Sequence, residues 1–294
     1  MNQPQIIQLP KITDDRGNLS FFESAVHLPF EIKRTFWIYD VPGGEERGGH
    51  AYHQAAEFIV ALSGSFDVIV DDGLGHQQTY HMNRSYYGLF VPKMMWRQMT
   101  NFSTNSLALV CASTEYNPVD YIFDYDRFLQ IKSQYTPIAI DHIVEATKRN
   151  ATLFDATKST VNDCHLVELD KHHSNRKGNL SVVENGKTVD FDVKRSYYLY
   201  DVPGGESRGA HAHKALKQLL IAVSGSFTVT LDDGQQKRAF TLNRPYQALF
   251  IQPGLWRDLD NFSSGSVCLC LASEHYQAED YIRDYNEFLA FKKQ

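Results

Sequence analysis

The sequence predicts an all-β chain made of two tandem copies of a small barrel or jelly roll, each closed by a C-terminal helix. Three observations lead to this prediction. The second half repeats the first, short strands alternate with tight turns, and each copy ends in a run with helical spacing. The 294 residues are 43% hydrophobic, which is enough for two cores. We expect an N-terminal copy at 1–132, a connector at 133–163 and a C-terminal copy at 164–294.

The two halves match along nearly their whole length. Arg47-Gly48-Gly49-His50 recurs as Arg208-Gly209-Ala210-His211, and other segments recur at almost the same spacing. Self-similarity of this extent indicates a duplicated structural unit. The other matched pairs are 33–45 with 194–206, 63–66 with 224–227, 101–103 with 261–263, and 120–122 with 280–282.

Each copy consists of short strands and turns, followed by one helix. In the second copy, 218–223 and 226–231 flank a Ser-Gly turn, as expected for a hairpin. Further short apolar runs continue the pattern, and the spacing of aromatic and aliphatic residues over 281–289 predicts the closing helix. The first copy has the same helical pattern at 121–129, and the connector is expected to contain a short helix at 140–149.

Composition excludes several classes of protein. The net charge of −6 offers no basic surface for nucleic acid. No apolar run reaches the length of a membrane span, and residues 1–10 lack the pattern of a signal peptide. The cysteines form no CxxC pair, and Cys268 and Cys270 are spaced to share one face of a strand. We therefore expect a cytoplasmic protein with no disulfide framework and no nucleic-acid or membrane partner.

The densest group of chemistry-bearing residues lies in the second copy. His211 and His213 are two apart on a predicted strand, so both imidazoles point to one face. They could be metal ligands, acid–base groups, or a surface pair with salt-bridging arginines. In the acid–base interpretation, Arg195 and Arg208 hold an anionic group or an enolate oxygen, and a neighbouring tyrosine polarises a carbonyl.

Residues 194–214, with 224–226 and 232–234, resemble the dTDP-sugar 3,4-ketoisomerase family, and the likeness continues to 280–282. Its members are cupins of bacterial surface-sugar pathways. They convert a dTDP-4-keto-6-deoxyhexose to its 3-keto isomer without a metal. Because they are usually one-cupin chains that work as dimers, the resemblance implies two tandem cupins forming a pseudo-dimer within this chain. A homodimer of the whole chain is left open.

The resemblance also implies roles for individual residues, with a dTDP-linked deoxysugar as substrate. His213 shuttles protons through an enediol, and His211 positions or assists it. Tyr198 is the expected catalytic tyrosine and Tyr197 the alternate, because the strand phase is uncertain by one residue. Trp256 either stacks on the thymine or the sugar, or is a core residue. The implied substrate-binding residues are Arg195, Arg208, Tyr197 and Trp256.

The first copy departs from this pattern. Tyr52 stands where the second copy has His213, and Phe36-Trp37 replaces the tyrosine pair. We predict a degenerate site that serves as a structural partner; the alternative is a different substrate or modified chemistry. The counterparts of the second-copy site are Arg34, Trp37, Arg47, His50 and Tyr52.

Two other functions remain open at this point. One is a non-catalytic nucleotide-sugar-binding bicupin, suggested by the degenerate first copy. The other is a metal-dependent bicupin oxygenase or isomerase. Metal-binding cupins carry a Glu where this chain has Lys217 and Gln218, and a His where it has Arg257. Cationic side chains disfavour a bound cation, so we expect neither a metal nor another cofactor.

Overall fold

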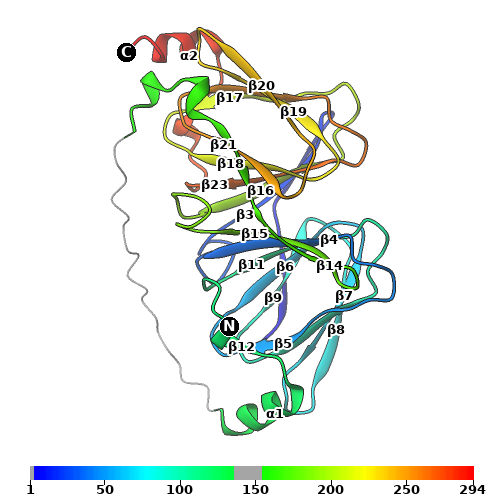
Figure 1. The fold of residues 1–294 in the computed structure, drawn as a ribbon. Coiled ribbons are helices and arrows are strands. Elements are labelled where there is room, and N and C mark those ends of the chain that lie inside the picture. Colours follow the sequence, from blue (N-terminus) through cyan, green and yellow to red (C-terminus); the bar gives the residue numbers. More distant parts are fainter. Residues whose placement is uncertain (1–2, 136–153) are drawn as a thin grey trace.

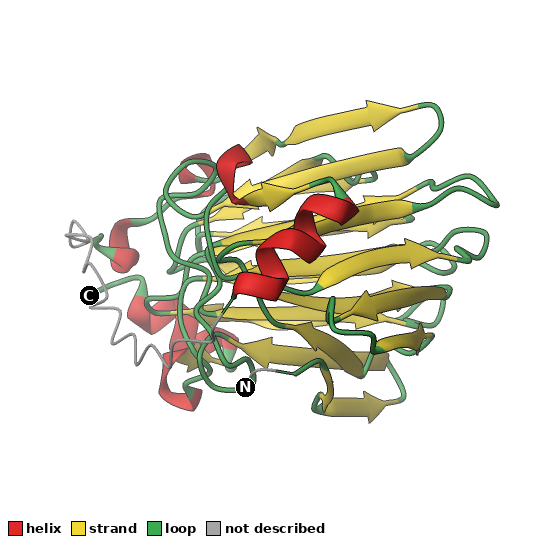
Figure 2. Ribbon diagram, turned by 90° about the horizontal axis from the view of Figure 1, so that it is seen from below, coloured by secondary structure: helices red, strands yellow, loops and turns green. Residues whose placement is uncertain are grey.

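The computed structural model describes residues 3–135 and 154–294 and confirms the expected fold class. Two β-barrels lie one above the other in Figure 1, and a short helix follows the strands of each. Seen from below in Figure 2, the strands form the body of the molecule and the helices lie outside them. The expected connector helix at 140–149 lies outside the described residues.

The elements of the two copies follow each other in corresponding order. The first copy contains β1 (Gln5–Gln8), β2 (Lys11–Asp14), β3 (Gly17–Glu23), β4 (Arg34–Tyr39), β5 (Arg47–Tyr52), β6 (Glu57–Ser63), β7 (Phe66–Asp71), β8 (Gln77–Met82), β9 (Tyr87–Val91), β10 (Trp96–Thr100), β11 (Leu107–Ala112), η1 (Pro118–Asp120), β12 (Tyr121–Ile122) and α1 (Tyr125–Gln134). The second contains η2 (Ala156–Lys158), η3 (Val161–Asp163), β13 (His165–Glu168), β14 (Asp170–Ser174), β15 (Gly178–Glu184), β16 (Arg195–Tyr200), β17 (Arg208–His213), β18 (Gln218–Ser224), β19 (Phe227–Asp232), β20 (Lys237–Leu242), β21 (Gln247–Ile251), β22 (Trp256–Asp260), β23 (Val267–Ala272), η4 (Ala278–Asp280), β24 (Tyr281–Ile282) and α2 (Tyr285–Phe291).

Each barrel is built from a seven-stranded and a five-stranded sheet. In β19, Phe227, Val229 and Leu231 are buried and alternate with half-buried threonines, which is the period expected of a strand with one face on a core. The sheets of the first barrel have the orders β1-β9-β6-β11-β4-β15-β14 and β12-β5-β10-β7-β8. Those of the second barrel have the orders β13-β21-β18-β23-β16-β3-β2 and β20-β19-β22-β17-β24.

The two copies exchange hairpins. β2 and β3 of the first copy complete the large sheet of the second barrel, where β3 pairs with β16. Reciprocally, β14 and β15 of the second copy complete the large sheet of the first barrel, where β15 pairs with β4. Asn18 donates to Asp201 at 2.9 Å, and Asn179 donates to Asp40 at the same distance. The copies are thus interlocked within one chain by a reciprocal exchange.

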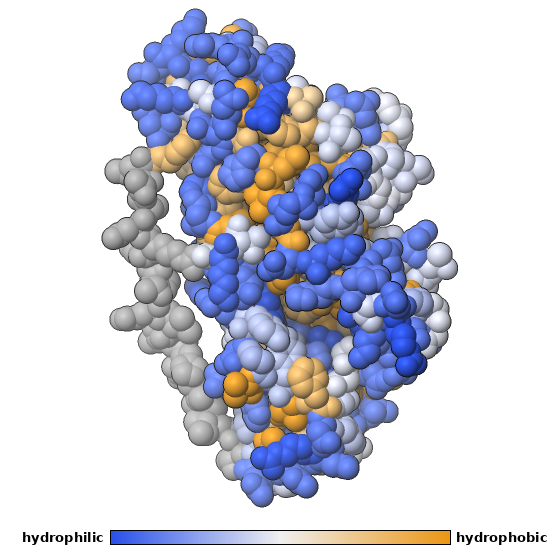
Figure 3. All heavy atoms as spheres, in the orientation of Figure 1, coloured by the Kyte–Doolittle hydropathy of each residue, from blue (hydrophilic) through white to orange (hydrophobic). Residues whose placement is uncertain are grey.

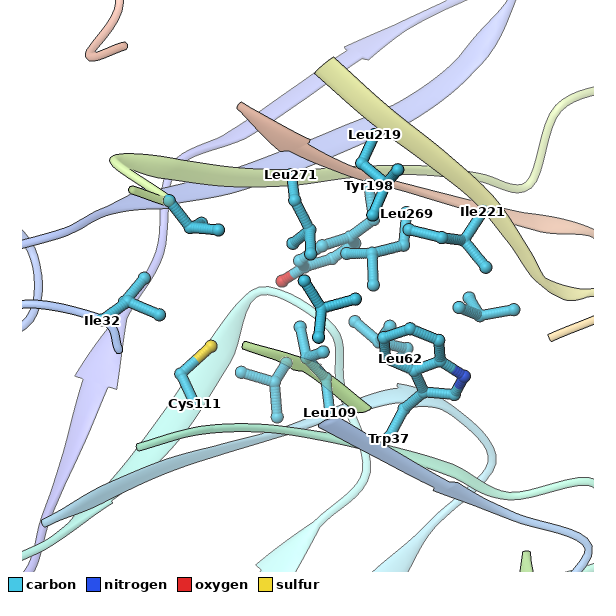
Figure 4. Packing of buried hydrophobic residues seen from close by; sticks show 14 of the residues in the cluster. Ile32, Trp37, Leu62, Leu109, Cys111, Tyr198, Leu219, Ile221, Leu269 and Leu271 are labelled. Carbon is cyan, nitrogen blue, oxygen red and sulfur yellow. The ribbon is translucent and has the colours of Figure 1, made fainter. Parts of the chain in front are cut away.

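A hydrophobic layer between the barrels buries the second face of each large sheet. Figure 4 shows Trp37 of β4 and Tyr198 of β16 in this layer, among Leu109, Leu219 and Leu269. The Trp37 indole donates to the Pro245 carbonyl at 2.8 Å, and the Tyr198 hydroxyl donates to the Ser85 carbonyl. Both faces of β4 and β16 are therefore buried, one against its own barrel and one against the other barrel.

Separate cores fill the barrels and anchor the helices. Cys268 and Cys270 lie together in the core of the second barrel, as their spacing predicted, and all four cysteines are buried and unpaired. On the face shown in Figure 3, hydrophilic residues predominate, with hydrophobic ones between them. No helix in the described ranges is long and apolar enough to cross a membrane.

Candidate active site

A β-bulge in β17 brings the polar side chains of the second barrel to one face. Arg208 pairs with Leu259 and His211 with Arg257, although Arg208 and His211 are three residues apart. On a regular strand an odd separation would place them on opposite faces, and the additional residue Ala210, with φ of 53°, corrects this. Arg208, His211 and His213 therefore all face the barrel interior.

A glycine is required beside this bulge. Gly209 has φ of +95°, and a Cβ atom on it would lie 2.7 Å from the carbonyl oxygen of Arg257 on β22. A side chain here would push β17 away from β22 and would misplace both histidines. In the Arg-Gly-x-His motif, the arginine and histidine therefore supply polar groups to the site, while the glycine allows β17 and β22 to pack closely.

His213 is held in one orientation by a carboxylate. Its Nδ1 lies 2.7 Å from Oδ2 of Asp280 in η4, and Oδ1 of Asp280 accepts from the backbone N–H of Ala215 at 2.7 Å. The other ring nitrogen, Nε2, is buried without a hydrogen-bond partner in the protein. Burial lowers the pKa of His213 to about 4, although the bond to Asp280 opposes this shift. At neutral pH the ring is uncharged, with Nε2 available as a base.

His211 is neutral as well, but both of its ring nitrogens already have hydrogen-bond partners within the protein. Nε2 accepts from Nη2 of Arg257 at 2.8 Å, and Nδ1 lies 2.9 Å from the carbonyl oxygen of Gly209. Because an arginine can only donate, Nδ1 carries the proton. Burial, followed by the charge of Arg257, lowers the pKa of His211 to about 2. The ring is perpendicular to that of His213, with 4.9 Å between their centroids, and supports it from the side.

The tyrosine that joins the histidines is Tyr197. Its hydroxyl accepts from Nε2 of Gln218 at 2.9 Å and from Nη2 of Arg257 at 3.1 Å. The same Nη2 atom donates to His211, so one guanidinium nitrogen connects the two groups. Burial raises the pKa of Tyr197 well above its usual value, which keeps the hydroxyl protonated.

Tyr198, the expected catalytic tyrosine, does not lie with the histidines. Neighbouring residues of β16 point to opposite faces, and Tyr198 lies in the layer between the barrels (Figure 4). Its hydroxyl donates to the Ser85 carbonyl. Its first-copy counterpart Trp37 lies in the same layer, so the counterpart of Tyr197 is Phe36. The prediction was wrong by one residue of strand phase.

Trp256 is also displaced from the expected place. On β22, Arg257 points inward to His211, and Trp256 points outward. The indole packs beneath α2, with ring centroids 5.2 Å from Tyr285 and 5.8 Å from Phe288. It is a core residue, which was the alternative the sequence left open, and it does not line the site.

The two predicted arginines do lie at the site, and one is paired with the first copy. Arg195 donates to the Tyr281 hydroxyl at 3.3 Å, and its guanidinium lies over the Tyr197 ring. Arg208 donates to Oδ2 of Asp14 at 3.2 Å. Asp14 ends strand β2, so the exchanged hairpin supplies part of this site.

Several buried nitrogens at the site have no hydrogen-bond partner in the protein. Buried polar groups are normally paired, so a group of unpaired nitrogens around one interior, most of them arginine donors, indicates a place for a polar or anionic ligand. In the part of the chain that the structure describes, these atoms are Nε of Arg195, Nε and Nη2 of Arg208, Nε and Nη1 of Arg257, and Nε2 of His213.

The corresponding place in the first barrel is occupied by an ion pair. Both oxygens of Glu57 accept from Arg97, at 2.7 and 2.9 Å, and Oε1 also accepts from the Tyr52 hydroxyl at 2.9 Å. The guanidinium of Arg97 lowers the pKa of Glu57 despite complete burial. His50 retains the position of His211, and burial lowers its pKa to about 3. Arg34 corresponds to Arg195, and its guanidinium lies over the Phe36 ring, which offers no hydroxyl.

Sequence reasoning missed Asp280 altogether and gave Arg257 and Gln218 no function. The signal for Asp280 was available, because 120–122 and 280–282 are part of the repeat. Within the described residues, 3–135 and 154–294, no group of three or more His, Cys, Asp or Glu side chains is arranged to hold a metal ion.

Comparison with known proteins gives a consistent set of matches. The family described as FdtA, WxcM-like, C-terminal, matches residues 2–133 and again 162–293. A TDP-4-oxo-6-deoxy-alpha-D-glucose-3,4-oxoisomerase from Aneurinibacillus thermoaerophilus is 43% identical over 112 residues, which cover 38% of this chain and 81% of that protein.

Solved structures match in the same way. A 3,4-ketoisomerase from Helicobacter canadensis is 44% identical with a TM-score of 0.44, over 45% of this chain and 98% of its own. WlaRB, a TDP-quinovose 3,4-ketoisomerase from Campylobacter jejuni, is 45% identical with a TM-score of 0.43, over 44% and 99%. A mutant of the 3,4-ketoisomerase QdtA from Thermoanaerobacterium thermosaccharolyticum, 34% identical with a TM-score of 0.44 over 46% and 96%, was solved in complex with TDP-4-keto-6-deoxyglucose. Each matched protein is as long as one copy of the repeat.

Proposed function

The chain belongs to the FdtA, WxcM-like family, and from this premise we propose that its second barrel moves the keto group of a dTDP-4-keto-6-deoxyhexose from C4 to C3. It is a homologue of TDP-sugar 3,4-ketoisomerases. The observation that carries the proposal is the buried His213 ring, with Nδ1 held by Asp280 and Nε2 unpartnered. As the family resemblance implies, we place the reaction in bacterial surface-sugar biosynthesis in the cytoplasm.

The proposed reaction requires a base and an acid, and each of the two groups must recover its starting protonation state at the end. Nε2 of His213 removes the proton from C3, while the Tyr197 hydroxyl donates a proton to the C4 carbonyl oxygen, and an enediol forms. The protonated His213 then delivers a proton to C4. The C3 hydroxyl returns its proton to the Tyr197 oxygen as C3 becomes the ketone. Both residues finish in their starting state, and the sugar is isomerised without net oxidation.

The protonation states of the free site fit these roles. His213 is neutral at pH 7 because burial lowers its pKa to about 4, and Tyr197 is protonated because burial raises its pKa. The charges of Arg257 and Arg195 also lower the pKa of His213. An anionic substrate in the barrel offsets these cations and strengthens His213 as a base at the moment it is needed.

The arginines are proposed to bind and orient. Arg195 and Arg208 have unpaired buried nitrogens that would bind the sugar or the diphosphate. Arg257 donates to both His211 and Tyr197 and so fixes the two groups relative to each other. Since Nε2 of His211 already accepts from Arg257, the two imidazoles are arranged for proton transfer between organic groups rather than for joint metal ligation.

We propose that the first barrel has no isomerase activity. Its site lacks the tyrosine hydroxyl at Phe36, and Tyr52 stands in place of the basic histidine. The carboxylate of Glu57 neutralises Arg97 and occupies the interior. Its function is then to complete the second barrel with β2, β3 and Asp14.

The test is NMR spectroscopy of dTDP-4-keto-6-deoxyglucose incubated with the pure protein. We expect the 3-keto isomer to accumulate, and exchange in D₂O to label the new C4–H. We expect His213→Asn to lower turnover by about 10²–10⁴-fold, the usual contribution of a general base. Binding of the nucleotide sugar without any 3-keto product would instead support a non-catalytic binding protein.

The matched control is His50→Asn in the first barrel. His50 is buried and its Nε2 is also unpartnered, so this variant loses a comparable ring from a comparable environment. We expect turnover close to that of the wild type. Loss of activity in His50→Asn, with activity retained in His213→Asn, would assign the chemistry to the first barrel and refute the proposal.

A further inference from the structure

Glu23 is the last residue of β3, the strand that the first copy contributes to the large sheet of the second barrel. In the register of β3 and β16 it lies directly opposite Arg195, so the two side chains are on the same face of the sheet. The side chain of Glu23 is only 12% exposed. A carboxylate with so little access to water needs partners within the protein.

The carboxylate of Glu23 holds a loop of the second copy, residues 273–277. Oε1 accepts from the backbone N–H of Tyr276 at 2.6 Å and lies 3.8 Å from Nδ1 of His275. At the start of the loop, the backbone N–H of Ser273 donates to the carbonyl of Lys217 at 3.1 Å. A hydrogen bond to an ionised acceptor is about twice as strong as a neutral one. The loop is therefore fixed at its start on its own copy and near its end on the other copy.

The ring of Tyr276 covers Arg195 from outside the barrel. The guanidinium carbon of Arg195 lies 5.5 Å from the ring centroid of Tyr276 and 5.6 Å from that of Tyr197, so the cation contacts two aromatic rings. Tyr276 is 53% exposed, whereas Arg195 is 3% exposed. Since no core packing holds an exposed ring, the loop backbone determines where Tyr276 lies and how Arg195 is covered.

The corresponding loop of the first copy has an additional support. There the backbone N–H of Tyr116 donates to Oε2 of Glu184, on the other exchanged strand, at 2.8 Å. The side chain of Asn117 also caps η1, accepting from a backbone N–H at 3.1 Å. In the second copy, which the structure describes from residue 154 onward, Gln277 stands at that position and its side chain makes no capping hydrogen bond. The loop of the second copy thus depends more strongly on its glutamate.

We propose that Glu23 of the first copy is a positioning residue for the second site, holding Tyr276 over Arg195 and thereby orienting the guanidinium toward the substrate. The inference rests on the proposed function in one respect, that Arg195 binds the substrate. The proposed acid–base groups are held separately, because Asp280 accepts from the backbone N–H of Ala215. Loss of the Glu23 carboxylate therefore weakens binding and leaves the chemical step largely intact.

A double-mutant cycle tests the link, with binding of thymidine diphosphate to the full chain measured by isothermal titration calorimetry. Arg195→Lys keeps the charge but loses the planar group that stacks on Tyr276, and the binding event that it weakens is that of the second barrel. We expect Glu23→Ala to weaken this event about 10-fold, the loss of one charged interaction, but less than about twofold in the Arg195→Lys background.

A conservative variant and the turnover assay separate positioning from general support of the fold. Glu23→Gln still offers an oxygen to the N–H of Tyr276 and should bind within about threefold of the wild type. In NMR-monitored turnover, Glu23→Ala should raise KM about 10-fold and change kcat by less than about threefold.

Glu184→Ala is the matched control, because it removes the same carboxylate from the other exchanged strand. Tyr116, which Glu184 holds, lies beside Arg34 at 5.5 Å in the first barrel. We expect a similar loss of melting temperature by circular dichroism and unchanged binding and KM at the second barrel. An equal loss of binding in Glu184→Ala, or additive effects of Glu23→Ala and Arg195→Lys, would reduce Glu23 to a structural role and overturn the inference.

Two further outcomes are distinguishable. Tyr276→Ala changes an exposed side chain and must show the same coupling to Arg195→Lys, so it replaces Glu23→Ala if that variant does not fold. A wild type that binds no thymidine diphosphate overturns the inference. A wild type that binds thymidine diphosphate but forms no 3-keto product overturns the proposed isomerisation alone, because the cycle measures binding.

Discussion

Replacing Asp280 with Asn tests whether a carboxylate holds His213 as a base. The backbone N–H of Ala215 donates to Oδ1 of Asp280, so the amide oxygen of Asn must take that place and the NH₂ group must face the ring. A donor opposite Nδ1 forces the ring to accept there and to carry its proton on Nε2. Nε2 is the atom that must remove the proton from C3, so the variant has the wrong tautomer.

The expected magnitude follows from two effects. Loss of the correct tautomer removes the general base, and loss of the negative charge removes stabilisation of the imidazolium that forms. Together we expect kcat/KM to fall about 10³-fold, which corresponds to about 4 kcal/mol of transition-state stabilisation. The pH dependence changes as well. The neutral ring is the active form, so activity is lost as the pH falls through the pKa of His213, about 4 in the free protein. Since Asp280 raises that pKa, the acidic limb moves to lower pH without it.

The assay is NMR-monitored turnover as a function of pH, with Asp120→Asn as the matched variant. Asp120 is the first-copy counterpart and accepts from the backbone N–H groups of Gln54 and Ala55 at 2.7 and 3.0 Å, but Tyr52 stands in the place of the histidine. We expect a similar loss of thermal stability in both variants and a loss of turnover in Asp280→Asn alone. Turnover of Asp280→Asn within about twofold of wild type, or an equal loss in Asp120→Asn, would refute the reasoning.

Further predictions separate the adjacent tyrosines and the buried histidines. Tyr197→Phe should lower turnover at least about 10²-fold, whereas Tyr198→Phe should leave turnover unchanged. Each should cost about 1–3 kcal/mol of unfolding free energy, because buried partners of the lost hydroxyl are left unpaired: Gln218 and Arg257 for Tyr197, and the Ser85 carbonyl for Tyr198. Turnover lost in Tyr198→Phe and kept in Tyr197→Phe, measured by NMR, would restore Tyr198 as the catalytic tyrosine. Burial lowers the pKa values of His50, His211 and His213 to about 3, 2 and 4. The unfolded chain therefore binds more protons below about pH 6.5, so the stabilisation is complete above that pH and is lost as the pH falls toward 4, at about 1.4 kcal/mol per pH unit for each ring. Urea unfolding between pH 7 and 4.5 measures how steeply the free energy of unfolding depends on pH. We expect a shallower dependence in His50→Asn, and a dependence equal to that of the wild type would contradict the reasoning.

The barrels and their closing helices could be predicted because their signals are local. Apolar alternation in β19 and the helical spacing near each C-terminus act within a few residues of chain, and the repeat doubled each signal. The predicted starts of the helices were wrong, because 121–122 and 281–282 pair with β5 and β17 as the short strands β12 and β24, and α1 and α2 begin only at Tyr125 and Tyr285. The exchange of hairpins could not be predicted. The sequence of β3 requires a partner strand, but its apolar pattern is the same whether that strand is β4 of its own copy or β16 of the other.

The same exchange explains the error at the tyrosine pair. Strand phase can be assigned from sequence when one face is polar and one apolar. Both faces of β16 are buried, one against the second barrel and one against the first, so Arg195, Ser196, Tyr197 and Tyr198 give no alternation. Asp280 was missed for another reason, because it reaches His213 from a short helix 67 residues further along the chain.

The interlocked arrangement also gives a physical reason for keeping the first copy if, as we propose, it has no isomerase activity. Without β2 and β3, the second barrel would expose the edge of β16 and the apolar layer behind it. Arg208 would also lose Asp14, leaving a buried guanidinium beside the histidines without its counter-charge. The groups that hold the second site together thus come from both copies, while the groups that we propose to move protons come from one. A duplicated chain in this position can lose the chemistry of one barrel, as Tyr52 and Glu57 indicate, but it cannot lose that barrel's hairpin.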